Sequence, residues 1–210
     1  MAGCNLRCLH CQNWQLSQRS AEEQRVKRGT SEEIIKMAWK SACPSISYTY
    51  SEPLVSWEYV YETAKLAKKN KLKNIVVSNG FINPLPLKKL LPYIDAFNID
   101  LKSISGGFYK KICGARLAPV LEALKMIHKA KKHLEITNLI IPTLNDKEKN
   151  IKKLVSWIIE NLGKEVPLHF SAFYPCYKLS HLRATKPEVV IRAAEIAKKM
   201  GMKNVHTGNI

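Results

Sequence analysis

Three cysteines lie close together near the start of the chain, in the segment CNLRCLHC (4–11). They are Cys4, Cys8 and Cys11, and their spacing is C-x3-C-x2-C. Thiolates are soft ligands that proteins use for zinc and for iron–sulfur clusters. No fourth cysteine lies nearby in the sequence, so the segment predicts a metal centre in which one ligand position is left open.

Three kinds of site use closely spaced cysteines. A structural zinc site needs four closed ligands, usually from two C-x2-C pairs. The sequence has no second pair, and His10 lies between two of the thiols. A thioredoxin-type pair of Cys8 and Cys11 would leave Cys4 without a role, and no strand precedes it. A four-iron cluster fits best, because three thiolates hold three irons and the fourth iron stays open to an exogenous ligand.

The other cysteines, Cys43, Cys113 and Cys176, are single and scattered. Free cysteine is usually a small buried hydrophobe, and we expect this of all three. Six cysteines in 210 residues are too few for a disulfide scaffold. Their uneven clustering indicates metal binding or catalysis in a reducing compartment.

The composition predicts one sizeable domain. The chain has 210 residues and is 46% hydrophobic, which is enough for a core of its own. No signal peptide and no apolar run long enough to span a bilayer is visible. We therefore expect a cytoplasmic protein with no membrane span.

The charge is strongly positive, at +17, with a pI of about 9.7. Such a charge can attract nucleic acid or another acidic partner. Much of it is lysine spread along the surfaces of expected helices, and there is no arginine-rich tract with interleaved aromatic residues. We therefore interpret it as a solvated lysine coat and expect no nucleic-acid partner.

Strand-like and helix-like segments alternate along the chain. The strands are expected at 46–50, 74–78, 96–101, 134–141, 167–173 and 204–207. Their near-continuous apolar runs are typical of strands buried on both faces of a parallel sheet. The helices are expected at 34–42, 57–70, 118–132, 146–162 and 186–200. Thr30 and Glu33 form a predicted capping box, and Ser56 is a predicted N-cap. An open doubly wound sheet and a (β/α) barrel both fit this order.

Polar side chains follow several of these strands. The first three strands are followed by Ser51 and Glu52, by Ser78, Asn79 and Gly80, and by Asp100 and Lys102. Asn138, Ser171 and Tyr174 lie in or at the ends of later strands. In α/β folds the carboxyl ends of the strands carry the functional site. These side chains are therefore expected to converge on one mouth.

The cysteine motif resembles that of the radical S-adenosylmethionine (SAM) enzymes, and the resemblance covers essentially the whole chain. It extends through CQNWQLSQ, YTYSEP, VSNGF, NIDLK, FYKKICGARLAPVLEAL, LIIPTLND and SAFYPCYKL. These segments resemble the branch of pyruvate formate-lyase activating enzyme, and most closely the radical SAM member of the AMME/Memo/radical-SAM system. The resemblance implies an α/β fold, a partial (β/α)6-type radical SAM barrel.

The resemblance also implies a chemistry. Cys4, Cys8 and Cys11 would bind a [4Fe-4S] cluster, and SAM would chelate the open iron. One-electron reduction would cleave SAM to a 5′-deoxyadenosyl radical, which abstracts a hydrogen atom from a substrate. A flavodoxin or ferredoxin would supply the electron. An activating enzyme would take the hydrogen from a glycine of a partner protein, whereas a close relative would act on another peptide or on a small molecule; the sequence does not identify the substrate.

The strand ends take roles around SAM by the same resemblance. Ser51 and Glu52 would lie against the SAM amino group, with Glu52 accepting a charge-assisted hydrogen bond. Tyr50 and Ser51 stand where glycines are common in the family. Ser78 and Asn79 would flank the methionyl part or the ribose.

Lys102 would pair with the SAM carboxylate, and Asp100 would orient polar groups beside it. Val77 stands where the activating enzyme has an acid that helps to bind a monovalent cation. His10 stands where an aromatic residue commonly packs by the adenine, although it can equally be an ordinary surface histidine. Two alternatives stay open: an iron–sulfur or metal-binding module without SAM chemistry, and an RNA-modifying radical SAM enzyme.

The ends of the chain are short for such a barrel. Only Met1, Ala2 and Gly3 precede the cysteine loop, which in the family follows the first parallel strand. We therefore expect residues 1–210 to be one radical SAM domain that lacks its first strand and perhaps a C-terminal tail. The predicted strand at 46–50 would then have no partner on one side, which is an aggregation hazard.

Overall fold

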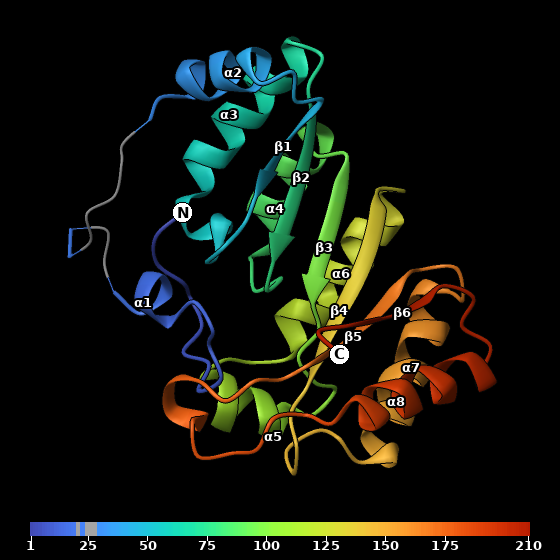
Figure 1. The fold of residues 1–210 in the computed structure, drawn as a ribbon. Helices are drawn as coiled ribbons and strands as arrows, with labels where there is room; N and C mark the ends of the chain where they lie inside the picture. Colours follow the sequence, from blue (N-terminus) through green and yellow to red (C-terminus); the bar gives the residue numbers. More distant parts are fainter. Residues whose placement is uncertain (20–21, 24–28) are drawn as a thin grey trace.

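The computed structural model describes residues 1–19, 22–23 and 29–210 (Figure 1). Its sheet has six parallel strands, and each pairs with the next in chain order. They are β1 (Ser45–Tyr48), β2 (Lys73–Ser78), β3 (Ala96–Asp100), β4 (His133–Ile140), β5 (Leu168–Ala172) and β6 (Val205–Gly208). All six expected strands are confirmed. The consecutive order is that of an open barrel, because a doubly wound sheet reverses its strand order at a switch point.

Helices link the strands and cover one face of the sheet (Figure 1). The five expected helices are confirmed as α2 (Ser31–Lys40), α3 (Trp57–Lys69), α6 (Ala118–Lys129), α7 (Glu148–Leu162) and α8 (Pro187–Lys199). Not expected were α1 (Trp14–Ser17), α4 (Pro84–Leu90) and α5 (Gly106–Phe108), the 3-10 turns Pro53–Ser56, Leu91–Tyr93 and Tyr177–Leu179, and a π-helical turn at Tyr109–Cys113. Right-handed crossovers between consecutive parallel strands place their helices on the same side.

The two faces of the sheet are buried to different extents. In β4, Leu134, Ile136 and Ile140 are buried beneath the helices, whereas Glu135 and Thr137 on the opposite face are only partly buried. The same alternation runs through β2, β3 and β5. The expectation of burial on both faces was therefore wrong. The sheet is open, so its concave face stays accessible.

Two expected helix starts have different outcomes. The capping box of α2 is confirmed, because Thr30 accepts a hydrogen bond from the backbone N–H of Glu33 and the Glu33 carboxylate accepts one from the N–H of Thr30 (3.2 and 2.8 Å). Ser56 makes no such bond to α3. The 3-10 turn Pro53–Ser56 runs directly into that helix, so the chain enters without needing a side-chain cap.

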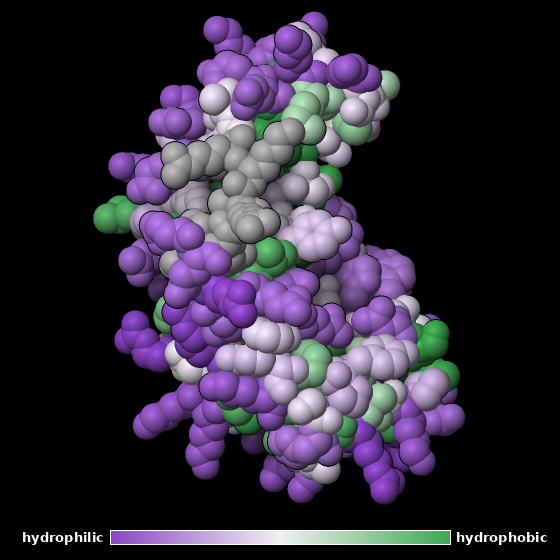
Figure 2. Space-filling model, turned by 60° about the vertical axis from the view of Figure 1, so that its left-hand side comes forward, coloured by the Kyte–Doolittle hydropathy of each residue, from purple (hydrophilic) through white to green (hydrophobic). Residues whose placement is uncertain are grey.

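One face of the molecule is mostly hydrophilic. Figure 2 shows hydrophilic side chains over most of one face, with only scattered apolar ones.

Strand β1 lies at the edge of the sheet and pairs only with β2 within the described ranges, which confirms the unpaired edge. Cys43 is exposed, so its expected burial was wrong, and Cys176 is only partly buried. No helix in the described part of the chain is long and apolar enough to cross a membrane.

Candidate functional site

A cavity of about 280 Å³ lies at the carboxyl ends of the strands, against the cysteine loop. All nine predicted site residues line it. They are Cys4, Cys8, Cys11, Ser51, Glu52, Ser78, Asn79, Asp100 and Lys102. They come from the N-terminal loop and from the ends of β1, β2 and β3. The fold thus brings together residues that are up to 98 positions apart in the sequence.

Backbone hydrogen bonds between the cysteine loop and two other segments hold the loop in place. The N–H groups of Arg7 and Leu9 donate to the carbonyls of Cys113 and Ile112 (2.8 and 2.9 Å). The N–H of Lys178 donates to the Leu9 carbonyl (3.1 Å). The loop is therefore held between the π-helical turn after β3 and the segment after β5, which positions its thiols without regular structure of its own.

Two of the thiols have polar neighbours. The sulfur of Cys4 accepts from the N–H of Leu6 (3.3 Å) and from Nδ2 of Asn79 (3.5 Å). Burial nevertheless raises the pKa of Cys4 to about 11. The thiol of Cys11 lies 3.0 Å from Oγ of Ser17. Amide and hydroxyl donors of this kind stabilise a thiolate when a metal replaces the proton.

Cys8 is buried and has a second cysteine beside it. The side chain of Cys113 lowers the pKa of Cys8 below its ordinary value, against the opposing effect of burial. The positive charge of Lys102 acts in the same direction. A lowered pKa favours the thiolate, which is the form of cysteine that binds a metal.

The donor set fits a cluster better than a single ion. Within the described ranges, no three His, Cys, Asp or Glu side chains are placed to hold one metal ion. A four-iron cluster binds each thiolate through a different iron. Its ligands therefore stand further apart than those of a single zinc ion, and three thiols around one cavity suit it.

Glu52 is the centre of a buried hydrogen-bond network. Its Oε1 accepts from the N–H of Leu54 (3.0 Å) and from Oγ of Ser78 (2.8 Å), and its Oε2 accepts from the N–H of Asn79 (2.8 Å). Burial raises its pKa to about 7, although these three donors favour the charged form. A carboxylate accepts about four hydrogen bonds, so one acceptor position remains for a ligand.

The turn before Glu52 is strained at Tyr50. Tyr50 has φ +83°, a left-handed conformation that favours glycine. Its side chain is exposed, and its carbonyl accepts from Nδ2 of Asn13 (2.5 Å). Oγ of Ser51 donates to the Met1 carbonyl (2.8 Å), so this hydroxyl is tied to the start of the chain. The chain thus keeps the backbone conformation of a glycine turn without a glycine.

Lys102 and Asp100 form an ion pair at the end of β3, with 3.0 Å between Nζ and Oδ2. Only 16% of the Lys102 side chain is exposed. Burial lowers the pKa of Lys102, but Asp100 and the nearby thiols outweigh it and raise the pKa well above its ordinary value. The ammonium therefore stays charged and faces the cavity.

His10 is buried rather than a surface residue, and it lines the cavity. Neither ring nitrogen has a hydrogen-bond partner among the described residues. Burial lowers the pKa of His10 to about 3, so the imidazole is neutral. Its ring lies 6.3 Å from that of Phe108. An unpartnered ring at a cavity wall is suited to contact a bound molecule.

Two strand residues that the sequence placed at the mouth do not line the cavity. Asn138 is on the helix-covered face of β4, where its Nδ2 donates to the Leu101 carbonyl (2.7 Å). Tyr174 is exposed, and its hydroxyl donates to the carbonyl of Asn209 (3.1 Å). Ser171, the third of these later residues, does line the cavity, together with Thr137, Leu139 and Asn209, which were not predicted. Because side chains alternate along a strand, Thr137 and not Asn138 faces inward.

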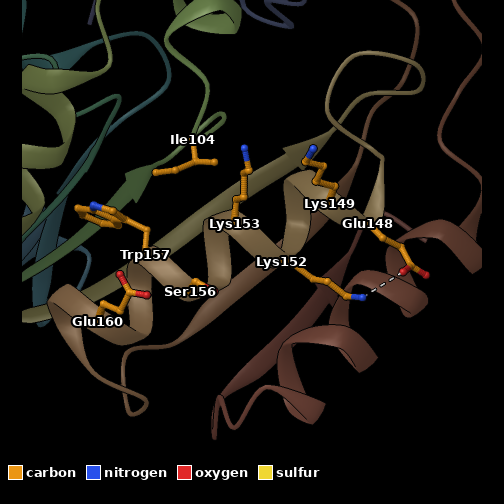
Figure 3. A pocket seen from close by; sticks show the side chains of 8 residues that line it. All are labelled: Ile104, Glu148, Lys149, Lys152, Lys153, Ser156, Trp157 and Glu160. Atoms are coloured by element: carbon orange, nitrogen blue, oxygen red, sulfur yellow. Dashed lines mark ion pairs between the residues drawn. The ribbon is translucent and has the colours of Figure 1, made fainter.

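A larger hollow, of about 730 Å³, lies on α7 and is not lined by any of the cysteines (Figure 3). Lys149, Lys152 and Lys153 line it with Trp157 and Ile104, and Lys152 pairs with Glu148 at 3.4 Å. It contains none of the predicted site residues. The smaller cavity at the strand ends is therefore the candidate site.

The chain belongs to the radical SAM superfamily, whose family model matches residues 1–155. That stretch includes the three cysteines and every predicted SAM-contacting residue. The superfamily consists of enzymes that use a [4Fe-4S] cluster and SAM. The donor set and the polar cavity described above agree with that membership.

The chain is also similar to an uncharacterized protein and to activating enzymes. An uncharacterized protein of Methanocaldococcus jannaschii is 43% identical over 210 residues, which cover 100% of this chain and 62% of that protein. The chain thus spans less than two thirds of that relative. The pyruvate formate-lyase-activating enzyme of Clostridium pasteurianum is 25% identical over 169 residues, covering 76% of this chain and 67% of the relative.

Solved structures share the fold. A domain of a pyruvate formate-lyase-activating enzyme from Bacteroides vulgatus superposes with a TM-score of 0.69 at 17% identity, over 79% of this chain and 99% of that one. SuiB of Streptococcus suis, in a crystal structure with S-adenosylmethionine, has a TM-score of 0.76 at 14% identity, over 99% and 48%. The open parallel sheet is therefore that of a partial radical SAM barrel.

Proposed function

We propose that residues 1–210 form one radical SAM domain that cleaves SAM reductively and uses the product radical to abstract hydrogen. The observation that supports this most is the shared cavity, in which three thiols face the polar ends of three strands. When bound, the cluster and SAM supply a 5′-deoxyadenosyl radical. Cys4, Cys8 and Cys11 would hold the cluster, and the cavity walls would exclude water from the radical.

The polar residues have complementary charges for the amino-acid part of SAM. The Lys102 ammonium would bind the SAM carboxylate and would be kept charged and oriented by Asp100. The remaining acceptor position of Glu52 would take the SAM amino group. Asn79 would lie beside both the cluster and SAM, because its amide donates a hydrogen bond to the sulfur of Cys4 (3.5 Å).

Similar proteins support a protein or peptide substrate. Several relatives are named activating enzymes, and SuiB has been crystallised with its precursor peptide, SuiA. We propose that such a segment binds at the concave face of the sheet, where the side chains of β4 and β5 are only partly buried. We propose a flavodoxin or ferredoxin as the source of the electron. Because a reduced cluster and six free cysteines need a reducing compartment, we propose a cytoplasmic location.

The test is anaerobic reconstitution with iron and sulfide, followed by dithionite reduction with SAM. The wild type should bind about four irons and release methionine and 5′-deoxyadenosine. Alanine at Cys4, Cys8 or Cys11 should abolish both results. Cys43→Ala is the matched control, because Cys43 is exposed and outside the cavity, and it should behave as wild type.

Other outcomes would contradict the proposal. Stoichiometric zinc without iron would indicate a structural metal site. A reducible cluster that never cleaves SAM would instead indicate an electron-transfer module. Binding to RNA that falls steeply with salt would favour an RNA-modifying enzyme.

A further inference from the structure

Three adjoining segments of the chain form the outside of the cysteine loop. They are residues 1–19, which include the loop and α1, residues 103–117, which include α5 and the π-helical turn, and residues 173–187, which follow β5. Figure 1 shows these segments side by side, and backbone hydrogen bonds join them. We call the surface that they form the loop face. It is the protein surface next to the proposed cluster ligands.

The contacts between these segments place basic residues beside the loop. The N–H of Arg7, within the loop, donates to the Cys113 carbonyl (2.8 Å). Lys110 and Lys111 belong to the π-helical turn that ends at Cys113. Lys178 contacts the loop from the third segment, because its N–H donates to a loop carbonyl (3.1 Å). Positive charges therefore lie on the loop and on both segments that hold it.

The loop face carries cations and no acidic residue. Residues 1–19, 103–117 and 173–187 contain no Asp or Glu. Their exposed basic residues include Arg7, Lys110, Lys111, Arg116, Lys178 and Arg183. Within the described ranges, none of these six forms an ion pair with an acidic side chain. Their charge is therefore available to an acidic partner.

The lysines on the helices are arranged differently. On α7, Lys152 pairs with Glu148 (3.4 Å), and Glu160 lines the same hollow. Helices α2 and α3 also mix lysine with glutamate. Such mixed charges are typical of a solvated surface, whereas like charges without acids repel one another and attract an oppositely charged partner. The loop face is thus distinct from the lysine coat.

An aromatic pair lies within the loop face. The rings of Trp14 in α1 and Tyr177 are stacked, with 5.3 Å between their centroids and an interplanar angle of 15°. Nζ of Lys178 lies 5.2–5.8 Å class distances from aromatic rings in this fold, at 5.5 Å from the Tyr177 centroid. Aromatic residues and cations of this kind are enriched in protein–protein interfaces.

We propose that the loop face is the docking surface for the electron donor, and that the donor is an acidic flavoprotein of the flavodoxin kind with an exposed flavin edge. This inference rests on the proposed function, because it requires a cluster at the three cysteines. The cations would steer an acidic protein to this face. The apolar edge of a flavin ring would pack against the aromatic pair.

The position of the loop face suits the transfer. Its six cations do not line the cavity, so donor and SAM bind at separate places. Electron transfer weakens steeply with distance, and the loop face adjoins the cysteines. One electron passes from the anionic flavin hydroquinone of the donor, which becomes the neutral semiquinone, to the oxidised cluster. No proton moves, and no bond forms or breaks.

The first measurement is anaerobic calorimetric titration of the cluster-loaded protein with oxidised flavodoxin. Wild-type binding should weaken as the salt concentration rises. Lys110→Glu/Lys111→Glu reverses two charges of the loop face and should weaken binding about tenfold at low salt. Lys152→Glu/Lys153→Glu is the matched control, because it changes the net charge equally on α7, and it should bind as wild type.

The second measurement compares two reductants in SAM cleavage. With flavodoxin hydroquinone, Lys110→Glu/Lys111→Glu and Lys178→Glu should both be slower than wild type. With dithionite, a small reductant that needs no docking surface, both should match it. Trp14→Ala removes an apolar contact and no charge, so it should weaken flavodoxin binding without changing its salt dependence.

The outcomes separate this inference from the proposed function. If the wild type binds no cluster, or does not cleave SAM with dithionite, the proposed function fails and the docking surface fails with it. If dithionite supports cleavage, but the loop-face variants bind and use flavodoxin like wild type, only the docking surface is refuted.

Other results would also overturn the inference. An equal loss in the α7 control would show that net charge, and not the loop face, determines binding. A wild type that accepts electrons from a ferredoxin but not from flavodoxin would refute the flavin donor. Loss of tRNA binding in Lys110→Glu/Lys111→Glu, with flavodoxin binding unchanged, would assign the face to RNA. If that variant loses its dithionite activity, Lys178→Glu decides.

Discussion

Replacing Glu52 with glutamine should flatten the pH dependence of stability. The Glu52 side chain is buried, and burial raises its pKa from 4.5 to about 7. Because the folded state holds this proton more tightly than the unfolded state, stability should fall as the pH rises. The full contribution is present below about pH 4.5 and is lost as the pH passes through about 7.

The magnitude follows from the same values. At about 1.4 kcal/mol for each pKa unit, a rise from 4.5 to about 7 corresponds to a loss of roughly 3 kcal/mol across that window. Glutamine cannot ionise, so the variant lacks this loss. It gives up one hydrogen bond, because its amide nitrogen cannot accept from the N–H of Asn79, which costs about 1–3 kcal/mol at every pH.

The assay is urea unfolding of the cluster-free protein, followed by tryptophan fluorescence, at pH 5, 6, 7 and 8. The free energy of unfolding of the wild type minus that of Glu52→Gln should decrease by roughly 3 kcal/mol between pH 5 and 8. Taking the difference removes the titration of histidines, which both proteins share. The variant should be the less stable protein at pH 5, and the gap should narrow or reverse at pH 8.

Two results would refute this reasoning. Parallel profiles would mean that Glu52 does not titrate in this range when folded. A difference that grows with pH would mean that the donors from Leu54, Ser78 and Asn79 outweigh burial and depress the pKa. Either result would also contradict the argument that a cationic ligand stabilises the buried Glu52 side chain at neutral pH.

Two other substitutions test the fold that carries the site. Gly80→Ala should destabilise the protein by about 2–4 kcal/mol in the same unfolding assay, because Gly80 has φ +70° and a Cβ would lie 2.9 Å from Cγ2 of Ile99. Gly106→Ala, where a Cβ meets nothing within 4 Å, is the control, and an equal loss there would contradict the argument. Burial raises the pKa of Glu135, but its bonds to His133 (2.9 Å) and His169 (2.8 Å) outweigh it and hold the pKa below its ordinary value. Glu135→Gln should therefore be less stable than wild type at pH 6, and the gap should close as the pH falls through the lowered pKa of Glu135; a gap that grows as the pH falls below 4.5 would count against it.

The strands could be predicted from the sequence because their signal is local. A run such as NIVVS has the β-branched composition of a strand wherever the chain places it. The strand ends then identify residues that the fold must bring to one edge, and Glu52, Ser78 and Lys102 do share a cavity. The side of the sheet on which each side chain lies was harder to predict. The sequence singled out Asn138, yet its neighbour Thr137 lines the cavity, because polarity alone does not show which face of an open sheet is covered.

Other features depended on tertiary packing that no local pattern reports. Helix α4 begins PLPLKKL, and its two prolines lie in the first turn, where the missing N–H groups cost little. In isolation such a segment is typical of a loop. Cys43 and Cys113 are both single cysteines in the sequence, yet Cys43 is exposed and Cys113 is buried. Cys113 ends the π-helical turn Tyr109–Cys113, which the sequence did not predict.

The features that weaken this fold are concentrated around its cavity. Glu52 is a carboxylate held in a buried position, and Tyr50 keeps a left-handed backbone. Neither ring nitrogen of His10 has a hydrogen-bond partner in the part of the chain that the structure describes. Each costs stability on the order of 1–3 kcal/mol, and such strain persists where the surrounding structure or a ligand compensates for it. A ligand with an ammonium group for Glu52 and a carboxylate for Lys102 would relieve part of that cost. The same residues that destabilise the fold around the cavity would therefore favour binding of an amino acid group.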